Sequence, residues 1–263
     1  GLITAIGYDD DAANAARQKA GPGAQLASFA QYLQKDRNVR PRAGGPVIAL
    51  VHAAGDIVEG DDRGAVGANT VDIAGDTYAY AIRAATRQSD VRAIVLRVDS
   101  PGGSAIAADQ ILDALKKAKA AGKPIVVSMG SVAASGGYYI SLAADRIVAE
   151  PGTLTGSIGV LWGKIAIGKS LELAGVEARD LSVGKNALFL SGVEPWDATQ
   201  LAAVNAQADL VYNDFTRKVA QGRNMPLDRV LDVARGRVWT GADAKDRGLV
   251  DELGGFWTAV ADA

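Results

Sequence analysis

Short apolar runs alternate with amphipathic segments along most of the chain, in the order expected for strands followed by helices. Four runs bounded by Gly, Pro or charged residues predict strands, at 47–51, 91–98, 124–129 and 146–149. The first, VIALV, is continuous enough to predict a strand buried on both faces. Apolar residues three and four positions apart predict helices at 77–86 and 107–121. This alternation predicts an α/β fold built on a mostly parallel sheet.

The C-terminal half shows longer elements. An apolar stretch at 160–167 is followed by a predicted helix at 169–174 and a predicted strand at 176–183. The longest helical pattern covers 197–221, and Gly222 is a residue type that ends helices. Its apolar positions are Leu201, Val204, Ala208, Val211, Phe215 and Val219. The remaining sequence predicts a closing strand, turn and helix.

The segment 124–145 carries no charge between Lys123 and Asp145, yet Ser and Gly interrupt it repeatedly. A transmembrane helix needs about 20 predominantly apolar residues, and these interruptions disfavour that interpretation. A buried strand, tight turn and buried helix fit better, with Gly136 and Gly137 relieving unusual dihedrals. Ser135 would then lie where strand gives way to helix, which resembles a nucleophile elbow. Ala133 replaces the first glycine of that motif, so spacing alone leaves packing and catalysis both open.

Composition removes several classes of chemistry. The 263 residues are 48% hydrophobic and 22% charged, as is typical of a globular protein. The formal charge of −2 does not indicate the excess of basic residues that is typical of nucleic-acid-binding proteins. The chain has no cysteine, which excludes disulfides, a thiol nucleophile and thiolate metal sites. The one histidine, His52, ends the first predicted strand, and we interpret it as structural.

The two ends of the chain resemble each other. GLITAIG at 1–7 and GLVDELG at 248–254 share glycines and apolar positions, which is typical of a duplicated unit. We therefore expect 1–20 to be the tail of a preceding repeat, 21–45 a linker and 46–263 one domain. The natural protein would then extend upstream by about one more domain.

Three blocks in order carry a family resemblance: DSPGGS at 99–104, AASGGY at 133–138 and GTLTGSIGV at 152–160. Together with the segment 236–254, they resemble the signal peptide peptidase A family, membrane-associated serine proteases with a ClpP/crotonase fold. The resemblance covers about 47–255. It implies repeated ββα units with a mostly parallel sheet, and a catalytic domain in the periplasm at the bacterial inner membrane.

The resemblance also implies roles for individual residues. Ser135 matches the family nucleophile of a Ser/Lys dyad, which acts through an acyl-enzyme. The turn at Gly102 and Gly103, together with Gly136, matches the oxyanion hole, and Ser157 matches the residue that orients the lysine. Implied substrates are signal peptide remnants and other peptides rich in small or apolar residues. We expect a homo-oligomer such as a tetramer, no metal and no cofactor.

The lysine of the dyad is missing from its expected place. In single-unit family members it follows the serine by a little over fifty residues, and the aligned position here is Ala187. Lys185 is two residues early, and extended backbone moves about 3.3 Å per residue, beyond hydrogen-bond tolerance. Double-length members instead carry the lysine in an upstream copy. We therefore expect an upstream lysine-bearing half as partner, with Lys185 as the less favoured base.

Two other functions stay open on the sequence. A crotonase-like acyl-CoA hydratase or isomerase would have a similar fold and oxyanion hole. Alternatively, this half could be a non-catalytic scaffold for assembly. Asp99, before the SPGG turn, is expected to cap that turn rather than to act as a base.

Overall fold

The computed structural model describes residues 9–22, 45–61, 72–184 and 186–263. The chain divides into two compact units, Gly1–Gly45 and Pro46–Ala263. The first unit contains the helix α1 (Asp9–Ala20). The repeat motif at 1–7 and most of the linker at 21–45 lie outside the described residues, so both interpretations stay predictions.

A mostly parallel sheet forms the centre of the second unit, as the sequence predicts. Its strands follow the order β1-β4-β5-β6-β9 and are all parallel to their neighbours. A short strand, β7, pairs in parallel with the end of β5, and β8 pairs antiparallel with β7. Two shorter strands, β2 and β3, form a separate parallel pair. The bounds are β1 (Val47–Ala54), β2 (Ile57–Val58), β3 (Ile73–Ala74), β4 (Val91–Ser100), β5 (Ile125–Ala134), β6 (Arg146–Ala149), β7 (Leu154–Gly156), β8 (Val238–Thr240) and β9 (Glu252–Leu253).

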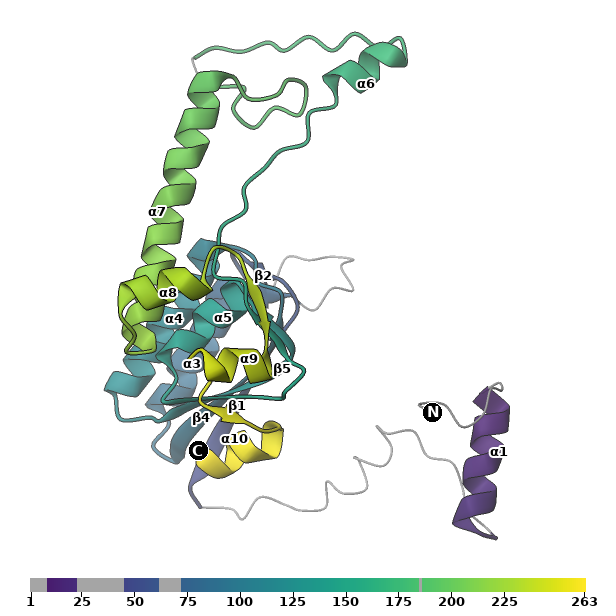
Figure 1. The fold of residues 1–263 in the computed structure, drawn as a ribbon, viewed down its shortest axis with the longest axis vertical. Coiled ribbons are helices and arrows are strands. Elements are labelled where there is room, and N and C mark those ends of the chain that lie inside the picture. Colours follow the sequence, from purple (N-terminus) through teal and green to yellow (C-terminus); the bar gives the residue numbers. More distant parts are fainter. Residues whose placement is uncertain (1–8, 23–44, 62–71, 185) are drawn as a thin grey trace. The chain divides into compact units, whose positions relative to one another are not determined.

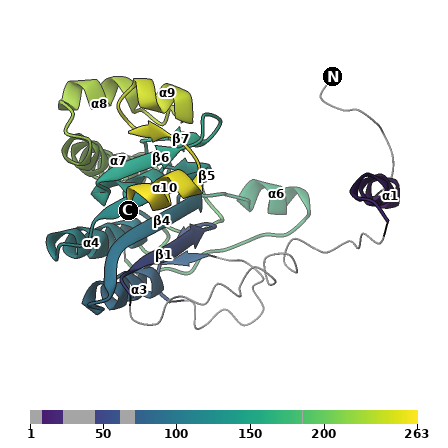
Figure 2. The ribbon, with the colours of Figure 1, turned by 90° about the horizontal axis from the view of Figure 1, so that it is seen from below.

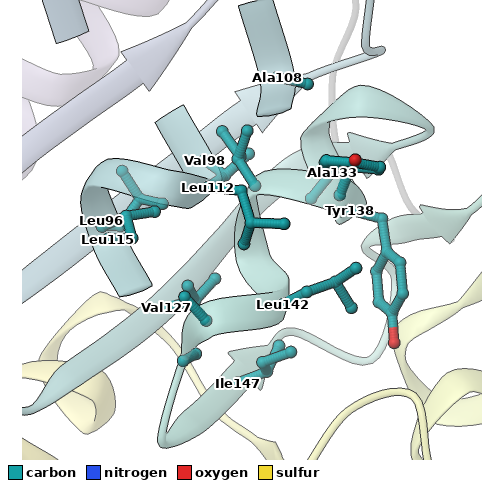
Figure 3. Packing of buried hydrophobic residues seen from close by; sticks show 14 of the residues in the cluster. Leu96, Val98, Ala108, Leu112, Leu115, Val127, Ala133, Tyr138, Leu142 and Ile147 are labelled. Carbon is teal, nitrogen blue, oxygen red and sulfur yellow. The ribbon is translucent and has the colours of Figure 1, made fainter. Parts of the chain in front are cut away.

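Helices cover both faces of the sheet (Figure 2). The main core lies under α3 (Gly75–Arg87), α4 (Ala105–Ala120) and α5 (Gly136–Ile140), to which every second strand residue points. Figure 3 shows Leu112 and Leu115 of α4 in this core together with Val98 and Val127 of the sheet. On the opposite face, Val126 and Val148 pack against Ala259 of α10 (Phe256–Asp262).

The predicted strand at 47–51 is present as β1 but is not buried as expected, and the predicted strand at 176–183 is absent. β1 is not buried on both faces: Ile48 and Leu50 are 41% and 55% exposed, because the strand lies at the edge of the sheet and no described helix covers that side. The segment 176–183 is not a strand, and Leu181 is fully exposed. No described strand lies beside this segment to accept its backbone hydrogen bonds, so its apolar residues do not make it a strand.

A long arm follows β7. It contains α6 (Gly168–Leu173) and leads to α7 (Ala198–Gly222), which begins with a capping box formed by Asp197 and Gln200. Figure 1 shows α6 and the first half of α7 extending away from the sheet. The second half of α7 packs on the core, followed by α8 (Leu227–Val233) and α9 (Gly241–Asp246). Among the described helices, none combines the length and apolar character needed to cross a bilayer.

Tyr138 offers a test of how α5 is fixed to the fold. Its ring is fully buried beside Leu142 (Figure 3), and its hydroxyl donates a 2.9 Å hydrogen bond to the backbone oxygen of Leu249. Tyr138→Phe would leave that buried oxygen without a partner, and we expect it to lower the free energy of unfolding by about 1–3 kcal/mol. Urea unfolding measures this change. Tyr80→Phe is the control, because Tyr80 is 66% exposed; equal effects would contradict the assignment.

Candidate active site

The strand register brings the three sequence motifs together. At the end of β4, Ser100 pairs with Ala133 of β5, and Ala134 of β5 pairs with Gly156 of β7. Because these strands are parallel, their carboxyl ends lie at one edge of the sheet. The SPGG turn begins at the last residue of β4, Ser135 follows β5, and Ser157 of the TGSIG block follows β7, so residues far apart in the sequence meet here.

Ser135 has an unusual backbone conformation. Its φ of 51° and ψ of −117° lie outside the regions that non-glycine residues commonly adopt. Such a conformation costs about 1–3 kcal/mol and persists only where the surroundings impose it. Here the amide of Ser135 donates to Gly156 O (2.9 Å), and its carbonyl accepts from Tyr139 N (2.8 Å). The serine is therefore fixed between β5 and α5, as the elbow interpretation expects.

The SPGG turn packs directly against this serine. A Cβ atom on Gly102 would lie 2.7 Å from Gly136 N and 2.8 Å from the Cβ of Ser135, so only glycine fits. At Gly103 an added Cβ would lie 2.1 Å from Ile57 O. Ile57 of β2 holds the turn from the other side, donating to Gly102 O (2.8 Å) and accepting from Ser104 N (2.7 Å).

Two backbone amides beside Ser135 are available as donors. Gly102 N donates to Ser100 Oγ at 3.1 Å and is therefore occupied. In the part of the chain that the structure describes, Gly103 N and Gly136 N make no hydrogen bond. An added Cβ on Gly136 would lie 3.2 Å from Gly103 N, which shows how close the two residues are. The pair could together bind one negatively charged oxygen.

Ser135 opens into a cleft of about 520 Å³. Gly103 and Gly136 line it together with Ser135, and most of the remaining lining is apolar. The walls come from the start of α4, from α5, from the middle and second half of α7 and from the segment after β7. The lining residues beyond the motif are Glu59, Ser104, Ala105, Ile106, Ala108, Tyr139, Gly159, Val160, Leu161, Trp162, Gln207, Val211 and Phe215.

The sequence did not single out these walls. The sequence identified Val211 and Phe215 only as apolar positions of a predicted helix. The periodicity predicts an apolar face, but it does not show whether that face packs in the core or lines a cleft. Tyr139 follows the motif glycines, and adjacent helical residues point in different directions. Tyr138 therefore enters the core while Tyr139 faces the cleft.

Other predicted residues have different positions. Ser157, with φ of 48°, directly follows the carbonyl that accepts from Ser135 N, and its own amide donates to Arg237 O (2.7 Å). Asp99 does not cap the SPGG turn: its Oδ1 accepts from Val132 N (3.0 Å) across the β4–β5 irregularity. Ser100 caps that turn instead. A side chain at the end of a strand can accept a hydrogen bond from the neighbouring strand. The spacing of residues in the sequence does not predict such a contact.

A general base for Ser135 is not evident in the described residues. In this part of the chain the Ser135 hydroxyl makes no hydrogen bond. His52 has an exposed side chain on β1 and does not line the cleft. Ala187 is exposed, and Lys185 lies outside the described residues. Within 9–22, 45–61, 72–184 and 186–263, no three His, Asp or Glu side chains lie close enough together to hold a metal ion.

Comparison with known proteins places this geometry in a family. The model of peptidase family S49 matches residues 117–263, which include Ser135, Gly136 and the TGSIG block. This match covers more than half of the chain. The chain belongs to peptidase family S49. A Clp protease model also matches residues 68–151 of this family member.

Relatives of the family member are proteases by name. It is 43% identical over 224 residues to "Protease 4" of Salmonella typhi, covering 85% of this chain and 35% of that protein. It is 36% identical over 269 residues to "Serine protease SPPA, chloroplastic" of Arabidopsis thaliana, covering 100% of this chain and 39% of that protein. The chain therefore spans about a third to two fifths of these relatives.

A solved structure confirms the fold class. A mutant of ClpP1 from Listeria monocytogenes superposes with a TM-score of 0.52 at 16% identity, covering 80% of this chain and 94% of that one. At this identity the likeness shows the fold alone. It confirms the ClpP-like α/β architecture that the sequence motifs imply.

Gly102→Ala tests the close packing of the turn on Ser135. Gly102 and Gly122 both have positive φ, so alanine introduces backbone strain of about 1–2 kcal/mol at either position. Only at Gly102 does the new methyl group also meet neighbouring atoms; around Gly122 there is nothing within 4 Å. We expect Gly102→Ala to lower the free energy of unfolding by at least about 1 kcal/mol more than Gly122→Ala, measured by urea unfolding. Equal losses would contradict the packing argument.

Proposed function

We propose that this chain is the serine-bearing part of a serine protease that hydrolyses apolar peptides, with Ser135 as nucleophile. One observation carries the proposal: a strained serine and two glycine amides that make no hydrogen bond among the described residues line one apolar cleft together. Membership of peptidase family S49 and the names of the relatives support it.

The chemistry uses the site as follows. Ser135 Oγ attacks the peptide carbonyl carbon, and its proton passes to a base. The carbonyl oxygen becomes negatively charged and accepts hydrogen bonds from Gly103 N and Gly136 N. In other enzymes, one such donor is worth about 2.7–4 kcal/mol of transition-state stabilisation. The C–N bond then breaks, the amine leaves with a proton, and water hydrolyses the acyl-enzyme to release the second product.

The substrates we propose are signal peptide remnants and similar peptides with small or apolar side chains. Apolar walls from α4, α5 and α7 would take such a side chain out of water, at about 25 cal/mol per Å² of buried apolar surface. The backbone of the peptide would lie extended, as is common where a protease reads alternate side chains.

We further propose that a lysine from a preceding unit of the intact protein is the base of Ser135. The Ser135 hydroxyl makes no hydrogen bond within the described residues, and Ala187 replaces lysine at the aligned position. Relatives two to three times as long leave room for such a unit. A lysine base needs partial burial so that its pKa falls toward neutrality. Ser157 would orient it, since it follows the carbonyl bonded to Ser135 N.

Assembly and location complete the proposal. We propose a homo-oligomer such as a tetramer, associated with the bacterial inner membrane and with its catalytic site in the periplasm. The arm after β7 supports assembly, because Leu161, Leu173 and Leu181 are each more than 90% exposed.

Ser135→Ala in the intact protein, with its preceding unit, is the direct test of the nucleophile. We expect peptide cleavage to fall at least about a thousandfold, because no acyl-enzyme can form. Hydrolysis of a fluorogenic apolar peptide measures it. Ser131→Ala, in the same strand but with an exposed side chain, should keep full activity. Unchanged cleavage by the Ser135 variant would favour a non-catalytic assembly role.

The source of the base is tested separately. The 263-residue chain alone should hydrolyse the same peptide at less than about one hundredth of the rate of the intact protein, since general-base catalysis contributes about 10²–10⁴-fold. Lys185→Ala in the intact protein should change the rate less than about twofold. Efficient turnover by the chain alone would refute the preceding unit as source. A large loss in the Lys185 variant would make that residue the base.

A further inference from the structure

A charged cluster joins the three helices that form the walls of the cleft. Lys218 of α7 lies with its Nζ 2.6 Å from Asp109 Oδ1 of α4, 2.6 Å from Tyr139 Oη of α5 and 2.8 Å from Asp214 Oδ2 of α7. The Tyr139 hydroxyl also lies 3.0 Å from each of the two carboxylates. We call these four residues the three-helix clamp. It connects one side chain of α4 and one of α5 to two of α7.

The clamp lies directly behind the cleft wall. Its residues Asp109 and Asp214 are chain neighbours of Ala108 and Phe215, and both of these line the cleft. Tyr139 belongs to the clamp and to the lining. Its ring packs against Phe215 with centroids 4.9 Å apart and planes inclined by 59°. The clamp therefore adjoins the ring pair that lies between α5 and α7 at the cleft.

Lys218 itself is unsuited to be the base of Ser135. Partial burial lowers the pKa of Lys218, but its hydrogen bonds to Asp109, Asp214 and Tyr139 outweigh burial and raise that pKa above its ordinary value. A lysine base needs the opposite shift. Its ammonium lies at the hydroxyl end of the Tyr139 ring, 5.1 Å from the ring centroid.

We propose that Lys218 is a positioning residue that sets the width of the specificity cleft, and so limits the size of the side chain accepted before the scissile bond. The inference rests on the proposed protease function. With the clamp intact, the ring pair of Tyr139 and Phe215 is a fixed wall. Without Lys218, the two carboxylates repel each other, α7 moves away from α4, and larger side chains fit.

Lys218→Met in the intact protein is the main test. The substrates are two peptides that differ only in carrying Ala or Phe before the scissile bond. We expect the Phe-to-Ala ratio of kcat/KM to rise at least about fivefold, mostly through KM of the Phe peptide. Tyr139→Phe keeps the ring but removes the hydroxyl, and it should shift the ratio in the same direction by less.

Arg223→Met is the matched control. Arg223 also joins α7 to another part of the core, through an ion pair with Asp251 and a hydrogen bond to Gly248 O, and it does not line the cleft. Its variant should lose stability without a change in the Phe-to-Ala ratio. If Lys218→Met changes the ratio less than twofold while losing similar stability, the clamp has only a structural role and the proposal is wrong.

A binding readout separates this proposal from the protease function. The dissociation constants of the same two peptides, measured by calorimetry in a Ser135→Ala background, should show the same shift with Lys218→Met. If Lys218→Met shifts the dissociation constants but the protein with Ser135 intact cleaves neither peptide, the protease function is refuted and the proposed role of the clamp stands. Peptides that do not bind would overturn both.

The clamp also predicts how specificity depends on pH. Burial raises the pKa of Asp109, but hydrogen bonds from Lys218 and Tyr139 outweigh it and lower that pKa below its ordinary value, so this carboxylate is charged between pH 5 and 9. Lys218 stays charged up to and beyond its ordinary value of 10.5. The Phe-to-Ala ratio should therefore be constant between pH 5 and 9 within about twofold, whatever the pH profile of the rate. A ratio that changes within this window would contradict the clamp.

Discussion

The close approach of one glycine turn to one serine is the constraint on which the site depends. Gly102 packs so tightly on Ser135 and Gly136 that an added methyl group would collide with Gly136 N, and a methyl group on Gly103 would collide with Ile57 O. That approach is possible because β4 and β5 are parallel and end at the same level, which places the turn of one strand beside the elbow of the next. Ile57 then holds the turn from outside through two backbone hydrogen bonds. The strain at Ser135 is maintained by this packing.

The helix α7 links the site to the exposed arm. Its second half packs on the core, and its residues from Gln207 to Phe215 contribute to the cleft, whereas its N-terminal part extends with the arm away from the sheet (Figure 1). The three-helix clamp lies in the second half, where the helix contacts α4 and α5. Any partner that contacts the exposed arm therefore acts on an element that also forms a cleft wall. In the proposed oligomer, this connection would link assembly to the choice of substrate.

Much of the fold and the motif residues could be predicted from the sequence, for reasons that particular residues illustrate. The apolar runs of β4 and β6 predict strands from neighbouring residues alone. The glycines of the SPGG turn predict a site where two backbone segments approach closely. The edge position of β1 could not be predicted, because an apolar run has the same pattern whether helices cover one face of the strand or both. The segment 176–183 failed as a strand because its apolar residues are exposed on the arm. Tyr139 and Lys218 were missed because their partners come from helices about 30 to 110 residues away in the sequence.

The most direct measurement of the central claim is the position of a covalent adduct. The intact protein would be treated with a fluorophosphonate, which reacts with activated serine nucleophiles, and the modified residue would be located by peptide mass spectrometry. We predict a single adduct on Ser135, formed by phosphonylation of its Oγ. A protein that cleaves its peptide yet carries the adduct on another serine, or none at all, would contradict the account. The absence of both adduct and cleavage would favour a crotonase-like hydratase or a scaffold instead.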